Sequence, residues 1–143
     1  MNHEEIKNKI IKAYNVLNAN TLNSLDDFYS TDIEFRDAVG VVIGLANLKK
    51  YYGKIYKNVK SISFEFHDFI IQDQNVVATW SMNFSAKGLN AGAHIKVSGN
   101  SYLKFREDGL VYYHRDYLDM GEMIYENIPL LGFIIKKIKQ SLE

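Results

Sequence analysis

The chain has 143 residues, which is the length of one ordinary domain and too short for two. Hydrophobic residues make up 47% and charged residues 24%, a composition that excludes intrinsic disorder. Seventeen basic and seventeen acidic residues cancel, so no overall positive field favours nucleic acid as a partner. The absence of cysteine excludes disulfides and thiolate chemistry. The N-terminus lacks the layout of a secretory signal, and no apolar run approaches the roughly 20 residues of a membrane span, so we expect a cytoplasmic protein.

The first part of the chain has the periodicity of helices. Apolar residues spaced three and four apart predict an amphipathic helix over residues 4–17 and a shorter one over residues 22–29. Asn20 and Thr21 separate the two, which indicates a helix hairpin. A third helix is expected from Gly44 to about residue 57.

The remaining pattern is that of strands. Ile33, Phe35 and Asp37 alternate with polar residues, as in a half-buried strand. Further strands are expected over residues 60–72, 76–87, 93–106 and 110–118, joined by segments with hairpin chemistry. Helices followed by antiparallel strands indicate an α+β domain, in which a strongly curved, mainly antiparallel sheet wraps around the helix hairpin and the third helix.

Residues 120–143 form a distinct helical tail. We expect a short helix over residues 121–127, with Asp119 as its N-cap, and a second helix that begins at Pro129. The second helix is unusually apolar and also carries three lysines. The favoured interpretation is that the tail packs on the same domain or on a dimer partner; the alternative is that it lies on a membrane surface.

Several motifs follow one another in a characteristic order. They are Leu17-Asn18-Ala19, Phe28-Tyr29, Asp37-Ala38-Val39-Gly40 and Tyr102-Leu103-Lys104-Phe105. This order resembles the nuclear-transport-factor-2-like superfamily, in its SnoaL-like and ketosteroid-isomerase-like branch. The resemblance covers about residues 4–119 and implies a cone-shaped domain over residues 1–119, extended by residues 120–143. We expect a homodimer.

Asp37 is the first candidate catalytic residue. The resemblance places it where ketosteroid isomerases carry their general base, which takes a proton from a carbon next to a carbonyl. It also implies a hydrogen-bonding role for Tyr14, although the motif alignment puts Ala13 there, while Ser101 occupies the place of the protonated aspartic acid. In a purely structural alternative, Asp37 accepts hydrogen bonds from the backbone of residues 38–40.

Asp116 is the second candidate. The sequence His114-Arg115-Asp116 resembles the His-Trp-Asp of SnoaL-like polyketide cyclases, which implies that Asp116 is the acid/base of an aldol ring closure. In a regular strand Asp116 shares a face with His114 and Tyr112, so a catalytic carboxylate–imidazole pair could shuttle a proton near neutral pH. The alternative is an ion-pair cluster with Arg115 or Arg106.

Candidate ligand contacts lie on the expected strands. They are Phe35, Trp80, Met82, Ser101 and Tyr102, and the alternative for the aromatic ones is that they are simple core residues. No metal-binding histidine motif and no glycine-rich nucleotide motif occurs, so we expect neither a metal nor a cofactor.

Two functions therefore remain open. One is the binding of a small apolar carbonyl compound with isomerisation or cyclisation by Asp-mediated proton transfer. The other is a non-catalytic module that binds a small ligand or mediates dimer assembly.

Overall fold

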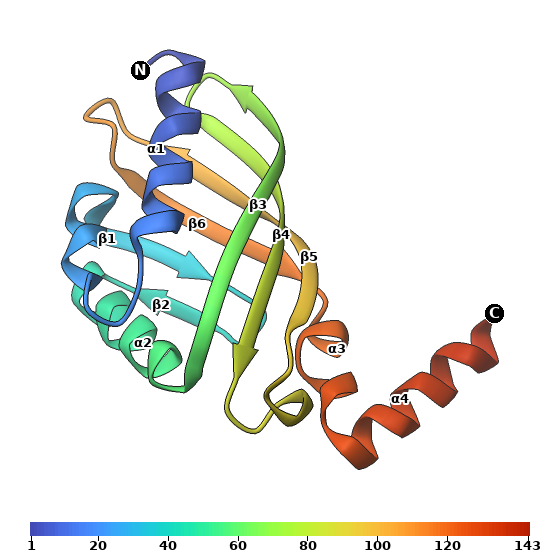
Figure 1. The fold of residues 1–143 in the computed structure, drawn as a ribbon. Helices are drawn as coiled ribbons and strands as arrows, with labels where there is room; N and C mark the ends of the chain where they lie inside the picture. Colours follow the sequence, from blue (N-terminus) through green and yellow to red (C-terminus); the bar gives the residue numbers. More distant parts are fainter.

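The computed structural model describes residues 1–143 as one curved sheet with helices on its concave side (Figure 1). The elements are, in chain order, α1 (His3–Val16), the 3-10 helix η1 (Leu22–Asp27), β1 (Tyr29–Arg36), β2 (Val41–Ile43), α2 (Leu45–Asn58), β3 (Val59–Gln72), β4 (Asn75–Ala86), the 3-10 turn η2 (Asn90–Gly92), β5 (Ile95–Phe105), β6 (Val111–Leu118), α3 (Met120–Met123), the 3-10 turn η3 (Tyr125–Asn127) and α4 (Pro129–Leu142).

The six strands form one sheet in the order β2-β1-β6-β5-β4-β3. Only β1 and β6 pair in parallel, and all other neighbours are antiparallel. The register between β3 and β4 shifts near Val59 and again between Phe66 and Phe69. Such irregularities bend a strand and increase its twist. The predicted α+β cone with a strongly curved, mainly antiparallel sheet is thus confirmed.

α1 and α2 each pack an apolar stripe against the sheet. A capping box fixes the start of α1: the Asn2 side chain accepts from the Glu5 amide at 2.9 Å, and the Glu5 carboxylate accepts from the Asn2 amide at 2.8 Å. Ile6 and Ile10 of α1 are buried, as is Leu48 of α2. These contacts place both helices over the concave side of the sheet.

The segment after α1 differs from the prediction. The expected second helix is a six-residue 3-10 turn, and β1 begins at Tyr29 rather than near Ile33. Asn, Ser and Asp in η1 are weak helix formers, and a spacing of three fits a 3-10 turn as well as an α-helix. The short strand β2 was not predicted, because three residues carry no readable periodicity.

The tail begins as predicted. The Asp119 side chain accepts hydrogen bonds from the amides of Gly121 and Glu122 and caps α3. Pro129 occupies the first turn of α4. No helix combines the length and apolar character needed to cross a membrane.

α4 lies apart from the sheet (Figure 1). Figure 1 shows α4 leading away from the sheet, and its main contacts are with η3. Gly132 packs closely on the backbone of Glu126, and Lys139 is hydrogen-bonded to the Glu126 carboxylate. α4 therefore contacts mainly the tail itself, and packing of α4 on a dimer partner stays a prediction.

Candidate functional site

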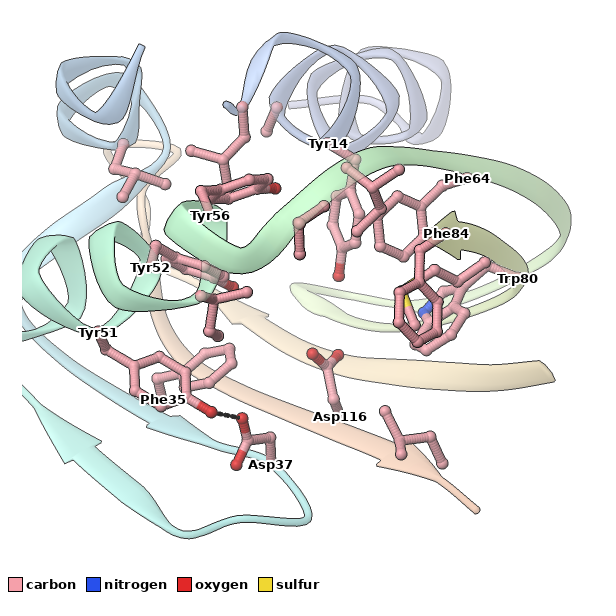
Figure 2. A pocket seen from close by; sticks show the side chains of 18 of the residues that line it. Tyr14, Phe35, Asp37, Tyr51, Tyr52, Tyr56, Phe64, Trp80, Phe84 and Asp116 are labelled. Atoms are coloured by element: carbon pink, nitrogen blue, oxygen red, sulfur yellow. Dashed lines mark hydrogen bonds between the residues drawn. The ribbon is translucent and has the colours of Figure 1, made fainter. Parts of the chain in front are cut away.

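A partly enclosed cavity of about 150 Å³ lies between the helices and the concave face of the sheet. Of its 21 lining residues, 19 are hydrophobic. The two exceptions are Asp37, which follows β1, and Asp116 on β6, and Figure 2 shows both around the same hollow. Two carboxylates from distant parts of the chain thus share one apolar cavity.

Of the five predicted ligand contacts, three line the cavity and two, Ser101 and Tyr102, do not. Phe35, Trp80 and Met82 line the cavity. Tyr102 does not, because it lies between the buried residues Ser101 and Leu103 and therefore belongs to the opposite face of β5. Its hydroxyl bonds the Asn75 side chain at 3.4 Å, outside the cavity. The structure therefore places Tyr102 outside the cavity, contrary to the expected ligand contact.

A buried hydrogen-bond network holds Asp116. Its Oδ1 accepts from the Ser101 hydroxyl at 2.5 Å and contacts His114 Nε2 at 2.7 Å. Since the single Ser101 proton goes to Asp116, Tyr14 must donate to Ser101, over a distance of 2.6 Å. Trp80 Nε1 also donates to Ser101, at 2.9 Å. Ser101 is thus the hub that links Asp116 to α1 and β4, and it lies behind the wall rather than on it.

His114 completes this network from behind. Its side chain is 1% exposed and does not line the cavity. The Tyr29 hydroxyl lies 2.7 Å from Nδ1, and Nε2 contacts Asp116, so both ring nitrogens have hydrogen-bond partners. His114 therefore contacts Asp116 from behind the cavity wall, and its catalytic role stays a prediction.

The rim ion pairs considered for Asp116 do not form. Arg106 pairs with Asp32 at 2.6 Å, and the Arg115 guanidinium lies 4.6 Å from the centre of the Tyr117 ring. Tyr112 is exposed and does not share the inner face, because the β5–β6 register shifts next to it. The carboxylate–imidazole pair is the arrangement that the structure contains.

Asp37 both accepts backbone hydrogen bonds and lines the cavity, so it has features of both interpretations that the sequence left open. Its Oδ1 accepts from the amides of Val39 at 2.8 Å and Gly40 at 3.0 Å, which is the backbone-bonding alternative. Its Oδ2 accepts from the Tyr51 hydroxyl at the edge of the cavity (Figure 2). Three donors therefore fix the carboxylate while it still lines the cavity.

The tyrosines of α2 are site residues that the sequence did not reveal. Tyr51, Tyr52 and Tyr56 all line the cavity. Burial raises the pKa of Tyr56 to about 12, so its hydroxyl keeps its proton at neutral pH. Burial also raises the pKa of Tyr14, and the nearby charge of Asp116 adds to this effect. The three α2 tyrosines have the spacing expected of the buried face of a helix. The sequence therefore did not distinguish them from ordinary core residues.

The model of the SnoaL-like domain matches residues 10–114, so the chain belongs to the SnoaL-like family, within the nuclear-transport-factor-2-like superfamily. Met123 lies beyond the matched region but still lines the cavity, so the extension contributes to the site. No curated protein sequence matches the chain. No group of three histidine, aspartate or glutamate side chains is arranged to hold a metal.

Solved structures share the fold at low sequence identity. TerC, co-crystallised with polyporic acid, is 15% identical over 80% of this chain and 92% of its own, with a TM-score of 0.69. A protein of ketosteroid-isomerase-like fold from Catenulispora acidiphila, in complex with trimethylamine, is 16% identical over 88% and 93%, with a TM-score of 0.73. A protein described as a SnoaL-like polyketide cyclase from Shewanella putrefaciens is 18% identical over 83% and 93%, with a TM-score of 0.72.

Proposed function

We propose that the protein binds a small apolar carbonyl compound in this cavity and that Asp116 takes a proton from the carbon next to the carbonyl. One observation carries the proposal. Both protein hydrogen bonds to Asp116 fall on Oδ1, which leaves Oδ2 free of protein partners in a carboxylate directed into the cavity (Figure 2). A base must have an oxygen within reach of the proton that it abstracts.

The proton transfer needs a partner for the charge that develops on the carbonyl oxygen. Tyr56 lines the cavity and makes no side-chain hydrogen bond with the protein, so its hydroxyl is available as a donor. Figure 2 shows Tyr56 on α2 across the hollow from Asp116. A hydroxyl that donates to the enolate oxygen stabilises the transition state. Asp37, with both oxygens already bonded, is better suited to hold a ligand than to accept a proton.

The size of the cavity limits the ligand. An engineered apolar cavity of about 150 Å³ binds benzene, so the 150 Å³ available here suits a compound of about one six-membered ring. The ligands of the related TerC and Catenulispora structures support small-molecule binding by this fold. Isomerisation and aldol cyclisation both begin with the same enolate, so one base serves either reaction.

Hydrogen–deuterium exchange next to the carbonyl of cyclohexanone tests the proposal without knowledge of the natural substrate. The wild-type protein should accelerate the exchange, and Asp116→Asn should lower the rate by about 100-fold or more, to near the background. Tyr56→Phe should lower it by about ten-fold or more, because an oxyanion donor is lost. Asp37→Asn should retain part of the activity.

Two outcomes would contradict the proposal. Exchange as fast in Asp116→Asn as in the wild type would exclude Asp116 as the base. Ligand binding with no exchange in the wild type would indicate the non-catalytic binding module instead. Thermal unfolding of each variant serves as the control for an intact fold.

A further inference from the structure

The charges that face the cavity are all negative. Asp37 and Asp116 line it, and no lysine, arginine or histidine does. His114 lies behind Asp116 and does not line the cavity. Two carboxylates at one apolar cavity, without a cation among the lining residues, make a site of negative potential.

The walls suit a cation as well. Ten of the lining residues are aromatic, and they come from both helices and from the sheet. Tyr14 meets Phe64 edge to face at 4.9 Å, and Phe64 meets Trp80 in the same way at 5.4 Å, so neighbouring rings stand in different planes around the hollow. The negatively polarised faces of aromatic rings attract alkylammonium groups, which aromatic cages bind.

We propose that the ligand of this cavity carries a small alkylammonium group, held between Asp37 and Asp116 against the aromatic walls. The inference rests on the proposed function and narrows its substrate class from apolar carbonyl compounds to cationic amino-carbonyl compounds. A wholly neutral ligand would displace water from both carboxylates and return no compensating charge, which is costly in an apolar site.

Asp37 is the anchor in this arrangement. Two backbone amides and the Tyr51 hydroxyl fix its position. Tyr51 is the only donor to Oδ2, and a carboxylate oxygen accepts two hydrogen bonds, so Oδ2 retains capacity for an ammonium. Asp116 then keeps its role as the base on the other side of the ligand.

A pair of isosteric probes isolates the charge. Choline and its carbon isostere, in which a tert-butyl group replaces the trimethylammonium, have nearly the same shape and differ in one positive charge. Isothermal titration of the wild-type protein should show choline binding about ten-fold or more tightly than the isostere. Asp37→Asn should reduce this preference, the ratio of the two affinities within the variant, by about ten-fold. Glu65→Gln removes the same charge from the exposed face of β3 and should leave the preference intact.

Equal affinity for the two probes, binding of neither probe, or a preference that survives in Asp37→Asn would each overturn the inference. The preference is the ratio of two affinities measured on the same variant. Partial unfolding lowers both affinities alike and therefore leaves this ratio unchanged. The outcome is also separable from the proposed function. If the preference for choline is absent but cyclohexanone exchange still depends on Asp116, only the inference of a cationic ligand is refuted. If the preference is present but no exchange occurs, only the proposed catalysis is refuted.

Discussion

Ser101 is the residue on which the geometry of Asp116 depends. It accepts from Trp80 and Tyr14 and donates to Asp116. Ser101→Ala leaves two buried donors without an acceptor, each at a cost of about 1 to 3 kcal/mol. We therefore expect the free energy of unfolding to fall by about 2 to 6 kcal/mol, measured by denaturant titration. The exposed Ser98 on the same strand is the control, and Ser98→Ala should change it by less than about 0.5 kcal/mol. Equal effects of the two substitutions would contradict the network.

At the residue scale, the sequence predicted the positions of Asp37 and Asp116 better than the positions of the side chains around them. Alternation and family resemblance placed Asp37 and Asp116 at one cavity, because strand periodicity fixes which side chains face inward. The register shift beside Tyr112 could not be foreseen, since a bulge leaves no mark in the alternation. The role of Tyr56 was equally hidden, because an aromatic residue at helical spacing suits a core as well as a cavity wall.

Among the elements, α4 carries several exposed apolar side chains that nothing in the structure covers. Leu130, Ile134 and Ile138 are 75%, 46% and 54% exposed, although they are apolar. Such patches mark interaction sites. We predict that a chain ending at Asn127 loses self-association in sedimentation velocity but keeps the thermal midpoint of the cone, because α4 contacts mainly η3.

A full-length control separates the apolar face from the helix itself. Ile134→Lys together with Ile138→Lys should reproduce the loss of self-association, whereas Gln140→Lys should not. Undiminished self-association of the truncated chain would show that the dimer, if formed, uses another surface. A lower midpoint would show that α4 supports the cone after all.

The elements that were predicted correctly are those with long periodic patterns. α1, α2 and the strands β3 to β6 carry eight to fourteen residues each, enough for a period of 3.6 or 2 to stand out. The predicted helix over residues 22–29 was wrong. Leu25, Phe28 and Tyr29 are all buried, as a helix would require, but they belong to a 3-10 turn and the start of a strand. A spacing of three over one turn does not distinguish these structures.

At the scale of the whole molecule, the buried tyrosines of the cavity make the free energy of unfolding fall as the pH rises above about 10. Burial raises the pKa of five cavity tyrosines above the ordinary value of 10.0; they are Tyr14, Tyr29, Tyr51, Tyr52 and Tyr56. A raised pKa in the folded state stabilises the fold fully below the unfolded pKa of about 10. Above this pH the unfolded chain releases protons that the folded chain retains, so stability falls; for Tyr56 the loss runs from about 10 to about 12.

Ultraviolet absorbance of tyrosinate, followed together with circular dichroism, measures this linkage. We expect the five cavity tyrosines to ionise only as the helical signal is lost. Tyr56→Phe removes one of these protons and should make the decline of stability above pH of about 10 less steep. Complete ionisation of all ten tyrosines in a protein that keeps its helical signal would contradict the buried cavity.

The most direct measurement of the central claim is a crystal structure with phenol, which has the shape and polarity of a cyclohexanone enol. The account predicts phenol inside the cavity, with its oxygen hydrogen-bonded to Tyr56 and the neighbouring ring carbon facing Asp116 Oδ2. Phenol bound outside the cavity, or inside it with Asp116 turned away from the ring, would contradict the account.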